Sequence, residues 1–347
     1  MDTTQERQEE NRKTAGRGPS PEKFFETMVA YQRTAALKAA IELDLFTAIG
    51  EGKDSVFALA RRVNASERGV RILCDSLATI GFLRKTEEGY RLTADSAAFL
   101  DRKSQAYMGS AARFLASSYV RGGFENLAAI VRAGHPLRDE QFAEREHPAW
   151  TEFAGSMAPL AYVVARETAK LIDAESKMKV LDVAAGHGMF GIAVAQRNPQ
   201  ASIVAVDWAS VAAIAEENAR RAGLGGRYRV LAGDAREIEF GAGFDAVLIP
   251  NVLHIWDRAT NERFLKKVHR ALAPGGRAIV VELAPNDDRI SPTAPALFAL
   301  NMLANTMEGD AYTVSEHRGM LAKAGFGECE VRLLPPTSHT AFIATKS

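Results

Sequence analysis

An apolar run that ends in a glycine-rich turn, VLDVAAGHGMFG, lies at residues 180–191. The continuous apolar character of residues 179–183 predicts a strand that is buried on both faces. The small and apolar side chains of residues 189–196 have helical spacing and predict a helix that packs on this strand. Glycines at 186 and 188 let a ligand approach the turn, where the helix begins with unpaired N–H groups. The pattern therefore predicts a strand, a ligand-binding turn and a helix.

From residue 178 onward, strand-like runs alternate with helical stretches, which indicates an α/β fold with a parallel sheet. Parallel strands are expected at residues 179–183, 202–206, 228–232, 245–249 and 277–281. A capping box at residues 313–316 opens a helix that Gly325 closes. The last two strand-like runs, 329–333 and 340–345, have only residues 334–339 between them, so this pair must be antiparallel.

The part of the chain before the sheet has helical spacing and then the pattern of a β-hairpin, which would form the wing of a winged-helix module. Helices are expected from Phe24, over residues 35–49, over residues 56–63 and after the N-cap Ser66, followed by a hairpin over residues 82–92. Helix, turn, helix and hairpin together predict a winged-helix module. Its second helix mixes Glu67, Arg68, Arg71 and Asp75 instead of presenting a basic face, which favours dimerisation over DNA binding. A winged-helix regulator of DNA stays open as an alternative.

The domain organisation follows from these patterns. We expect a disordered tail at residues 1–21, a winged-helix domain at 22–105, a helical connector and substrate-pocket segment at 106–175 and a cofactor-binding catalytic domain at 176–347. Within the connector, Phe153 and Met157 lie on an aromatic and methionine stripe that leads to the glycine-rich strand. Such a stripe is core packing or one wall of a substrate pocket.

Composition and charge argue against several classes of protein. The 347 residues are 47% hydrophobic, which is ample for a large core, and Lys plus Arg equals Asp plus Glu at 43 each. A net charge of zero gives no global field for nucleic acid or anionic membranes. The two cysteines, Cys74 and Cys329, have no CxxC spacing, so neither a disulfide framework nor a zinc site is indicated. The polar N-terminus and the lack of a span-length apolar run lead us to expect a cytoplasmic protein.

Acidic residues follow three of the predicted parallel strands: Asp182, Asp207 and Asp234. Ligands of open α/β sheets bind at the carboxyl ends of the strands, so these acids belong beside the glycine turn. Residues 186–191 also match GxGxxG, the fingerprint of dinucleotide-binding folds. However, three residues separate Asp182 from the first glycine, which suits a ligand with an ammonium group and hydroxyls, such as S-adenosylmethionine, better than a pyrophosphate. A nicotinamide dehydrogenase is the alternative, although the antiparallel last pair counts against it.

The order of motifs VLDVAAGHG, VAVDW, GDA, NVLHIWD and LAPGGR, with the GY-LT wing, resembles the S-adenosylmethionine-dependent O-methyltransferases of the plant caffeate and bacterial antibiotic-tailoring type. The resemblance covers residues 22–345. It implies a Rossmann-like seven-stranded catalytic domain, an N-terminal winged-helix domain that forms a homodimer, and a general base at His254. The residues expected to bind the cofactor are Asp182, Gly186, Gly188, Asp207, Trp208, Gly233, Asp234, Ala235 and Asn251.

The chemistry of the site agrees with this resemblance. A phenol titrates near about 10 and an imidazole near about 6.5, so His254 can remove the phenol proton as the oxygen attacks. Glu282, at the end of the next strand, is expected to orient His254 and stabilise its charged form. Helix residues 295–307, with Phe153 and Met157, supply the expected acceptor pocket for a flat aromatic: Phe298, Asn301, Met302 and Asn305. No cluster of carboxylates suits magnesium, so no metal is expected.

One segment departs from the family pattern. The family's second acid near the base lies in a Gly-Gly-Lys-Glu-Arg-Thr stretch, and residues 308–313 of this chain read EGDAYT, with Ala311 at the acid's place. Either Asp310 or Glu308 substitutes for it, or the chain is one of the relatives that methylate carbon.

Overall fold

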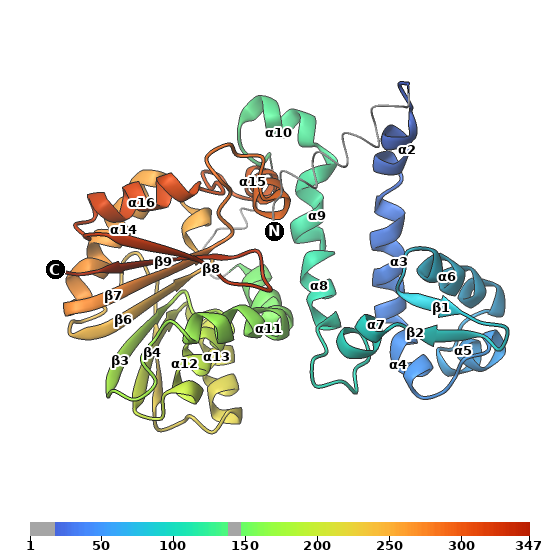
Figure 1. Ribbon diagram of the computed structural model, residues 1–347, viewed down its shortest axis with the longest axis horizontal. Coiled ribbons are helices and arrows are strands. Elements are labelled where there is room, and N and C mark those ends of the chain that lie inside the picture. The colour runs from blue at the N-terminus through green and yellow to red at the C-terminus, as the bar shows by residue number, and fades with distance from the viewer. Residues whose placement is uncertain (1–17, 138–146) are drawn as a thin grey trace. The chain divides into compact units, whose positions relative to one another are not determined.

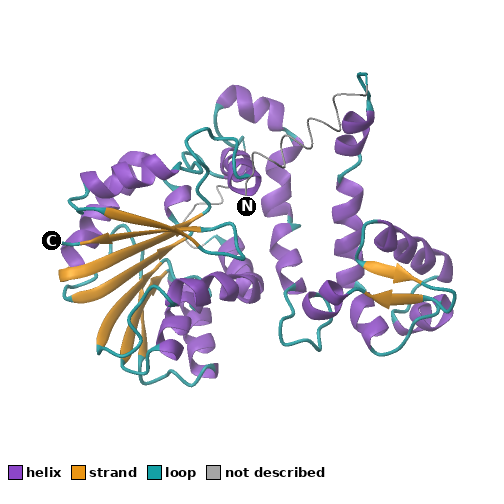
Figure 2. Cartoon of the chain, in the orientation of Figure 1, coloured by secondary structure: helices purple, strands orange, loops and turns teal. Residues whose placement is uncertain are grey.

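The computed structural model describes residues 18–137 and 147–347. The chain forms two compact units, residues 1–109 and 110–347, which Figure 1 shows as labelled elements and Figure 2 by secondary structure. Most of the predicted tail, residues 1–17, and part of the predicted connector, residues 138–146, lie outside the described residues.

The first unit packs short helices around a two-stranded hairpin, as predicted. The N-cap Ser66 accepts a hydrogen bond from the N–H of Gly69 at 3.1 Å, and the two strands pair antiparallel. The elements are α2 (Glu22–Met28), α3 (Tyr31–Glu42), α4 (Leu45–Gly50), α5 (Val56–Arg62), α6 (Glu67–Thr79), β1 (Leu83–Lys85), β2 (Tyr90–Leu92) and α7 (Ala94–Phe99). The helix, turn, helix and hairpin of the prediction are therefore all present.

The single helix predicted over residues 35–49 is wrong. Helix α3 ends at Glu42, and α4 begins at Leu45 after Asp44 adopts a left-handed conformation with φ of 56°. The Ala- and Leu-rich composition suggested one helix because helix propensity does not register a change of direction. The bend lets α4 bury its apolar side chains, and Arg62 and Arg102 pair with the Asp44 carboxylate. Tertiary packing thus overrides propensity here.

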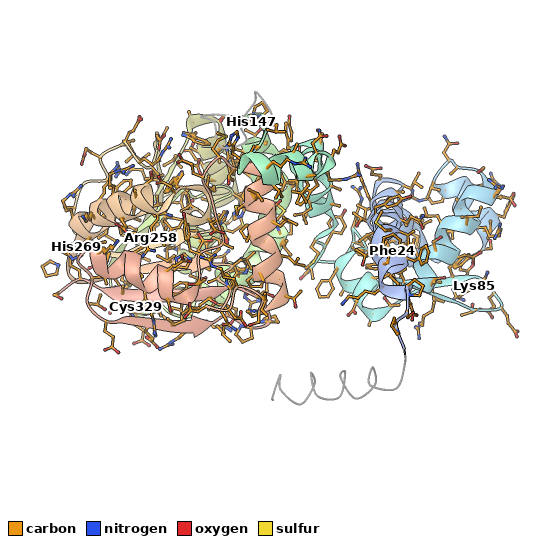
Figure 3. The ribbon with its side chains drawn as sticks, turned by 90° about the horizontal axis from the view of Figure 1, so that it is seen from above. Phe24, Lys85, His147, Arg258, His269 and Cys329 are labelled. Carbon is orange, nitrogen blue, oxygen red and sulfur yellow. The ribbon has the colours of Figure 1, made fainter. Side chains whose placement is uncertain are left out.

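The surface of α6 is electrically balanced. Arg71 pairs with Asp75 at 3.1 Å, and Asp75 also binds Lys85 of the hairpin at 2.6 Å. Because these cations are paired within the unit, they are poorly disposed to bind nucleic-acid phosphates. Helix α2, by contrast, carries large apolar side chains in solvent: Phe24, Phe25 and Met28 are 62%, 60% and 59% exposed. Figure 3 marks Phe24 on this helix. Such a group is typical of a surface that another molecule covers.

The second unit contains a seven-stranded sheet in the order β5-β4-β3-β6-β7-β9-β8. The first five strands of this order, β5, β4, β3, β6 and β7, are parallel to one another. Strand β9 pairs antiparallel with both β7 and β8. The strands are β3 (Met178–Val183), β4 (Ala201–Asp207), β5 (Tyr228–Ala232), β6 (Phe244–Pro250), β7 (Leu272–Glu282), β8 (Cys329–Leu333) and β9 (Thr340–Thr345). The predicted parallel sheet with an antiparallel last pair is therefore confirmed.

Helices cover both faces of this sheet (Figure 1). Alternate strand residues point to opposite faces, so Val180 packs with α11, α12 and α13 while Leu181 packs with α14 and α16. The predicted capping box at Thr313 and Glu316 is present. No helix in the described ranges is long and apolar enough to cross a bilayer. The helices are α8 (Ala112–Leu115), α9 (Ser118–Glu125), α10 (Leu127–Ala133), α11 (Pro148–Ala169), α12 (Met189–Arg197), α13 (Ala209–Arg221), α14 (Arg258–Ala271), α15 (Thr293–Asn305) and α16 (Val314–Lys323).

The contact of α12 with the sheet yields a test. A Cβ atom at Gly191 would lie 2.7 Å from Cγ2 of Ile203 and 2.9 Å from Oδ2 of Asp182. We expect Gly191→Ala to lower the free energy of unfolding by about 1–3 kcal/mol, measured by urea denaturation, because the added methyl overpacks a rigid core. Gly155→Ala on α11 is the matched control, since its Cβ would meet nothing within 4 Å. Equal stability of the two variants would contradict the close packing of α12.

Candidate active site

The predicted glycine turn joins β3 to α12. Gly186 and Gly188 have φ values of +57° and +77°, in the left-handed region that glycine adopts without strain. A Cβ atom at Gly188 would also lie 2.6 Å from Oη of Tyr228. Position 188 therefore requires glycine both for its backbone conformation and for the space around it.

Asp182 lies beneath this turn and is wholly buried. Its Oδ2 accepts a hydrogen bond from the N–H of Gly191 at 2.8 Å, whereas its buried Oδ1 accepts none from the described residues. Burial raises the pKa of Asp182 to about 7, with the Gly191 N–H opposing the shift and the charge of Asp207 adding to it. An unpaired buried oxygen is costly, so it calls for a hydrogen-bond donor, which can be a ligand, a water molecule or the hydroxyl of Tyr228, itself buried without a partner among the described residues.

Asp207, at the end of β4, is bound to the same turn. Its Oδ2 accepts a hydrogen bond from the N–H of Gly186 at 2.7 Å, and its Oδ1 accepts one from the N–H of Trp208 at 2.8 Å. Burial raises the pKa of Asp207 to about 6, against the effect of these two hydrogen bonds and with the charge of Asp234 adding to it. The carboxylate is thus fixed beside the first glycine of the turn.

Asp234 follows β5 and is 3% exposed. Arg236 donates to both of its oxygens, from Nη2 at 2.7 Å and from Nε at 3.1 Å. Of its neighbours, Gly233 donates its N–H to the carbonyl of Asp207 at 2.8 Å, and Ala235 is buried. The sequence prediction did not include Arg236; a basic residue two positions after a strand-end acid is the signal that would have indicated it.

The arrangement fits a nucleoside that carries an ammonium group. Asp182 and Asp207 lie at the carboxyl ends of β3 and β4, and Asp234 follows β5; these three strands are parallel neighbours, so the carboxylates lie in a row at one edge of the sheet. Carboxylates accept hydrogen bonds from ammonium, hydroxyl and amino groups, and they repel a pyrophosphate. With the orphaned oxygen of Asp182, these residues fit S-adenosylmethionine better than a nicotinamide dinucleotide.

Aromatic side chains of α11 pack against this turn. The ring of Phe153, which the sequence assigns to the acceptor pocket, stacks on His187 with 5.9 Å between centroids, and Trp150 contacts Trp208 at 5.9 Å. His187 Nδ1 accepts a hydrogen bond from the N–H of Met189 at 3.2 Å, and burial lowers the pKa of His187 to about 4. The sequence prediction passed over this neutral histidine, although a titratable side chain between the two glycines was a visible signal.

The predicted base and its partner meet at the carboxyl ends of β6 and β7. The chain turns at Asn251, whose φ is +52° and whose N–H donates to the carbonyl of Val281 at 2.8 Å. His254 follows this turn, and its Nδ1 lies 2.6 Å from Oε2 of Glu282. Both side chains are shielded, with 12% of His254 and 1% of Glu282 exposed. The structure therefore brings together the two residues for which the sequence predicts catalysis.

Glu282 accepts three hydrogen bonds. Besides the His254 contact, its Oε1 accepts from the N–H groups of Val252 at 3.0 Å and Leu253 at 2.8 Å. Burial alone would raise the pKa of Glu282, but the charge and hydrogen bond of His254, the charge of His317 and the Leu253 N–H lower it overall. Because an ionised carboxylate only accepts, Nδ1 of His254 must donate, and Nε2 carries the lone pair. A general base for a hydroxyl requires this tautomer.

Helix α15 lies against His254. The ring of Phe298 contacts the His254 imidazole edge to face, with 4.8 Å between centroids. Asn305 is 5% exposed, and its Nδ2 donates to Oδ1 of Asn301 at 3.0 Å and to the carbonyl of Val120 on α9 at 3.3 Å. The Asn305 amide therefore holds two helices together. Of the other two pocket candidates, Met302 is buried on α15 and Met157 is partly buried on α11.

The segment that departs from the family pattern lies next to His254. Ala311 is buried, and Asp310 pairs with Arg289 at 3.2 Å. Glu308 is exposed. Glu282 is the acid that hydrogen-bonds His254.

Two family models match the chain. The O-methyltransferase domain matches residues 138–327, and the O-methyltransferase dimerisation domain matches residues 25–102. The first range contains the glycine turn and His254, and the second contains the winged helix.

Known proteins agree with these matches. The 3-hydroxy-5-methyl-1-naphthoate 3-O-methyltransferase of Streptomyces sahachiroi is 30% identical over 322 residues, 91% of this chain and 92% of that one. A Nostoc punctiforme crystal structure assigned to the O-methyltransferases is 48% identical with a TM-score of 0.91, covering 95% of this chain and 100% of that one. Human N-acetylserotonin methyltransferase, solved with S-adenosylmethionine, shares the fold at 22% identity and a TM-score of 0.84, covering 96% and 99%. This chain belongs to the S-adenosylmethionine-dependent O-methyltransferases with an N-terminal dimerisation domain.

Proposed function

We propose that this O-methyltransferase methylates a phenolic hydroxyl of a small aromatic or polyketide-like metabolite, with His254 as the general base. The observation that carries the proposal is the 2.6 Å contact between Nδ1 of His254 and Oε2 of Glu282. That contact directs the lone pair of Nε2 away from Glu282, where it can accept the proton of the acceptor hydroxyl. Glu282 then stabilises the imidazolium that forms.

The row of strand-end acids and the glycine turn are the proposed cofactor site. Asp207 accepts hydrogen bonds from the ribose hydroxyls, and Asp234 accepts one from the adenine amino group. Asp182 supports the turn through Gly191 and turns its second oxygen to the methionine end. The remaining proposed contacts are Gly186, Gly188, Trp208, Gly233, Ala235 and Asn251. S-adenosylmethionine, when bound there, supplies a methyl group on a sulfonium that is activated for displacement.

The acceptor side is apolar with few polar groups. Phe298 flanks the imidazole, Met302 lies on the same helix, and Asn301 and Asn305 add the amides of the proposed pocket. An aromatic wall beside a base suits a flat aromatic whose hydroxyl is directed at Nε2. The naphthoate 3-O-methyltransferase, which is named for a hydroxylated bicyclic aromatic, supports the same class of acceptor for this chain.

We further propose that the protein is a homodimer through its N-terminal unit. The support is the match to a dimerisation domain and the exposure of Phe24, Phe25 and Met28 on α2. A second copy of the chain is the occupant that this surface would bury.

The proposed base is tested by His254→Gln. We expect kcat for a panel of hydroxynaphthoates to fall by about 10²–10⁴-fold, because the substituted side chain cannot take up the hydroxyl proton. Transfer is measured with methyl-labelled S-adenosylmethionine. Affinity for S-adenosylhomocysteine should change by less than about twofold, since the side chain lies outside the proposed cofactor contacts.

The control is His269→Gln, since His269 lies on α14 against Phe326 (Figure 3). It should retain wild-type transfer. Product analysis by NMR separates the alternatives: label on a ring carbon, with a rate indifferent to His254→Gln, would replace the O-methylation proposal by C-methylation.

Cofactor affinity should depend on pH through Asp207. Because burial raises the pKa of Asp207 to about 6, the carboxyl is protonated at lower pH and accepts ribose hydroxyls poorly. We expect the affinity for S-adenosylhomocysteine, measured calorimetrically, to rise at least about tenfold from about pH 5 to about pH 7.5 as Asp207 ionises, with a further rise from Asp182, whose pKa burial raises to about 7. Asp207→Asn should bind at least about tenfold more weakly at neutral pH and keep only the part of this dependence that Asp182 contributes.

The stability of the unliganded protein should have the opposite pH dependence. The folded-state pKa of Asp207 lies above the unfolded value of about 3.9, so its contribution is present at low pH and is lost as the pH rises through about 6. Glu175→Gln, at an exposed acid, is the control and should leave both curves unchanged. A pH-independent affinity in the wild type would refute the role of Asp207.

The dimer is tested by the double variant Phe24→Ser with Met28→Gln. Neither side chain is buried within its own unit, so we expect the unit to stay folded while sedimentation velocity changes from dimer to monomer. Phe57→Ser is the control, because Phe57 is 57% exposed on α5 of the same unit. A wild-type monomer, or a double variant that stays dimeric, would contradict the interface.

A further inference from the structure

The backbone of the base is packed against a glycine. A Cβ atom at Gly309 would overlap the carbonyl oxygen of His254 and lie 3.1 Å from that of Ile255. Such proximity to backbone atoms cannot be relieved by rotating a side chain. The turn after α15 therefore rests directly on the backbone that carries the imidazole, and only a residue without Cβ fits there.

The same turn is fixed to the end of α15. Thr306 is buried, its Oγ1 donates to the carbonyl of Met302 at 2.8 Å, and it accepts the N–H of Gly309 at 3.0 Å. Three residues further along, the hydroxyl of Tyr312 donates to the carbonyl of Trp256 at 2.7 Å. Residues 306–312 therefore lie alongside residues 254–256, the segment that carries His254.

Helix α15 is itself anchored from behind. A Cβ atom at Gly123 of α9 would overlap the carbonyl oxygen of Ala304 and lie 2.8 Å from Oδ1 of Asn305. Asn305 also donates to the carbonyl of Val120 on α9 at 3.3 Å. The two helices are therefore in backbone contact, which leaves α15 little freedom to slide. Any displacement of α15 would move both Phe298 and the turn at Gly309.

We propose that Gly309 is a positioning residue for His254. Glu282 orients the imidazole through Nδ1 on one side, and the turn at Gly309, with Phe298, fixes its backbone and ring on the other. Gly309 acts by allowing the 306–309 turn to approach the carbonyls of His254 and Ile255. This inference rests on the proposed function of His254 as the base.

The variant Gly309→Ala tests the proposal. Its methyl group must push the turn away from the His254 carbonyl, which turns the imidazole and disturbs the hydrogen bond to Glu282. We expect kcat for a hydroxynaphthoate to fall by about tenfold or more, while the dissociation constant of S-adenosylhomocysteine changes by less than about twofold. A merely structural role would change folding and cofactor affinity together.

A second measurement is independent of the acceptor. The full-length protein is labelled with ¹⁵N-histidine and saturated with S-adenosylhomocysteine, and the His254 signal among the seven histidines is assigned from its loss in His254→Gln. In the wild type we expect one tautomer, protonated at Nδ1. In Gly309→Ala we expect the signal of an average between the two neutral tautomers.

Two further variants keep the result interpretable. Gly225→Ala is the matched control, because a Cβ at this exposed glycine would meet nothing within 4 Å, and it should behave as the wild type. Thr306→Val removes the acceptor of the Gly309 N–H while keeping the side-chain shape. It should shift the tautomer and kcat in the same direction if Gly309→Ala fails to fold.

The two hypotheses fail in different ways. A folded Gly309→Ala protein with the wild-type tautomer and kcat would overturn the positioning role. If instead His254→Gln leaves methyl transfer unchanged, the base assignment fails, and the ¹⁵N spectrum still decides whether Gly309 orients the imidazole.

Discussion

The buried carboxylate of Glu282 is the constraint on which the reaction site depends. An ion removed from water costs several kcal/mol unless donors surround it, and here three do: the N–H groups of Val252 and Leu253 and the imidazole of His254. Two of these donors belong to the backbone that follows β6. The carboxylate therefore shapes the turn and orients His254 at once, and its position at the end of β7 ties both to the register of the two neighbouring strands.

The row of acids at the adjacent strand ends differs from Glu282, because burial there is not offset by enough hydrogen-bond donors or positive charge. Burial raises the pKa of Asp182 to about 7 and that of Asp207 to about 6, so ionising them in the unliganded protein costs free energy. A ligand that brings an ammonium group and hydroxyl donors offsets this cost, and part of its binding energy arises from that relief. Such a site is less stable without its ligand than a neutral core would be.

Local patterns carried the features that the sequence predicts correctly. Apolar runs defined the strands, and glycines 186 and 188 marked the turn between β3 and α12, because each of these features depends on neighbouring residues. The features that escaped prediction arise between distant segments: Phe153 packs on the glycine turn, and Asn305 binds the backbone of α9. The break at Asp44 escaped for a related reason, since burial of α4 outweighs a helical composition.

The proposed role of His254 as the base does not require the second acid that the family pattern would place at position 311. A neutral imidazole has one N–H to donate, and Glu282 already accepts it at Nδ1. A further carboxylate would contribute mainly orientation. In this chain the ring of Phe298 and the close approach of Gly309 to the His254 backbone can supply orientation by packing. Packing of this kind adds no further buried charge beside Glu282. With Ala311 in place of the second acid, Glu282 alone is therefore sufficient to hold His254 in one tautomer.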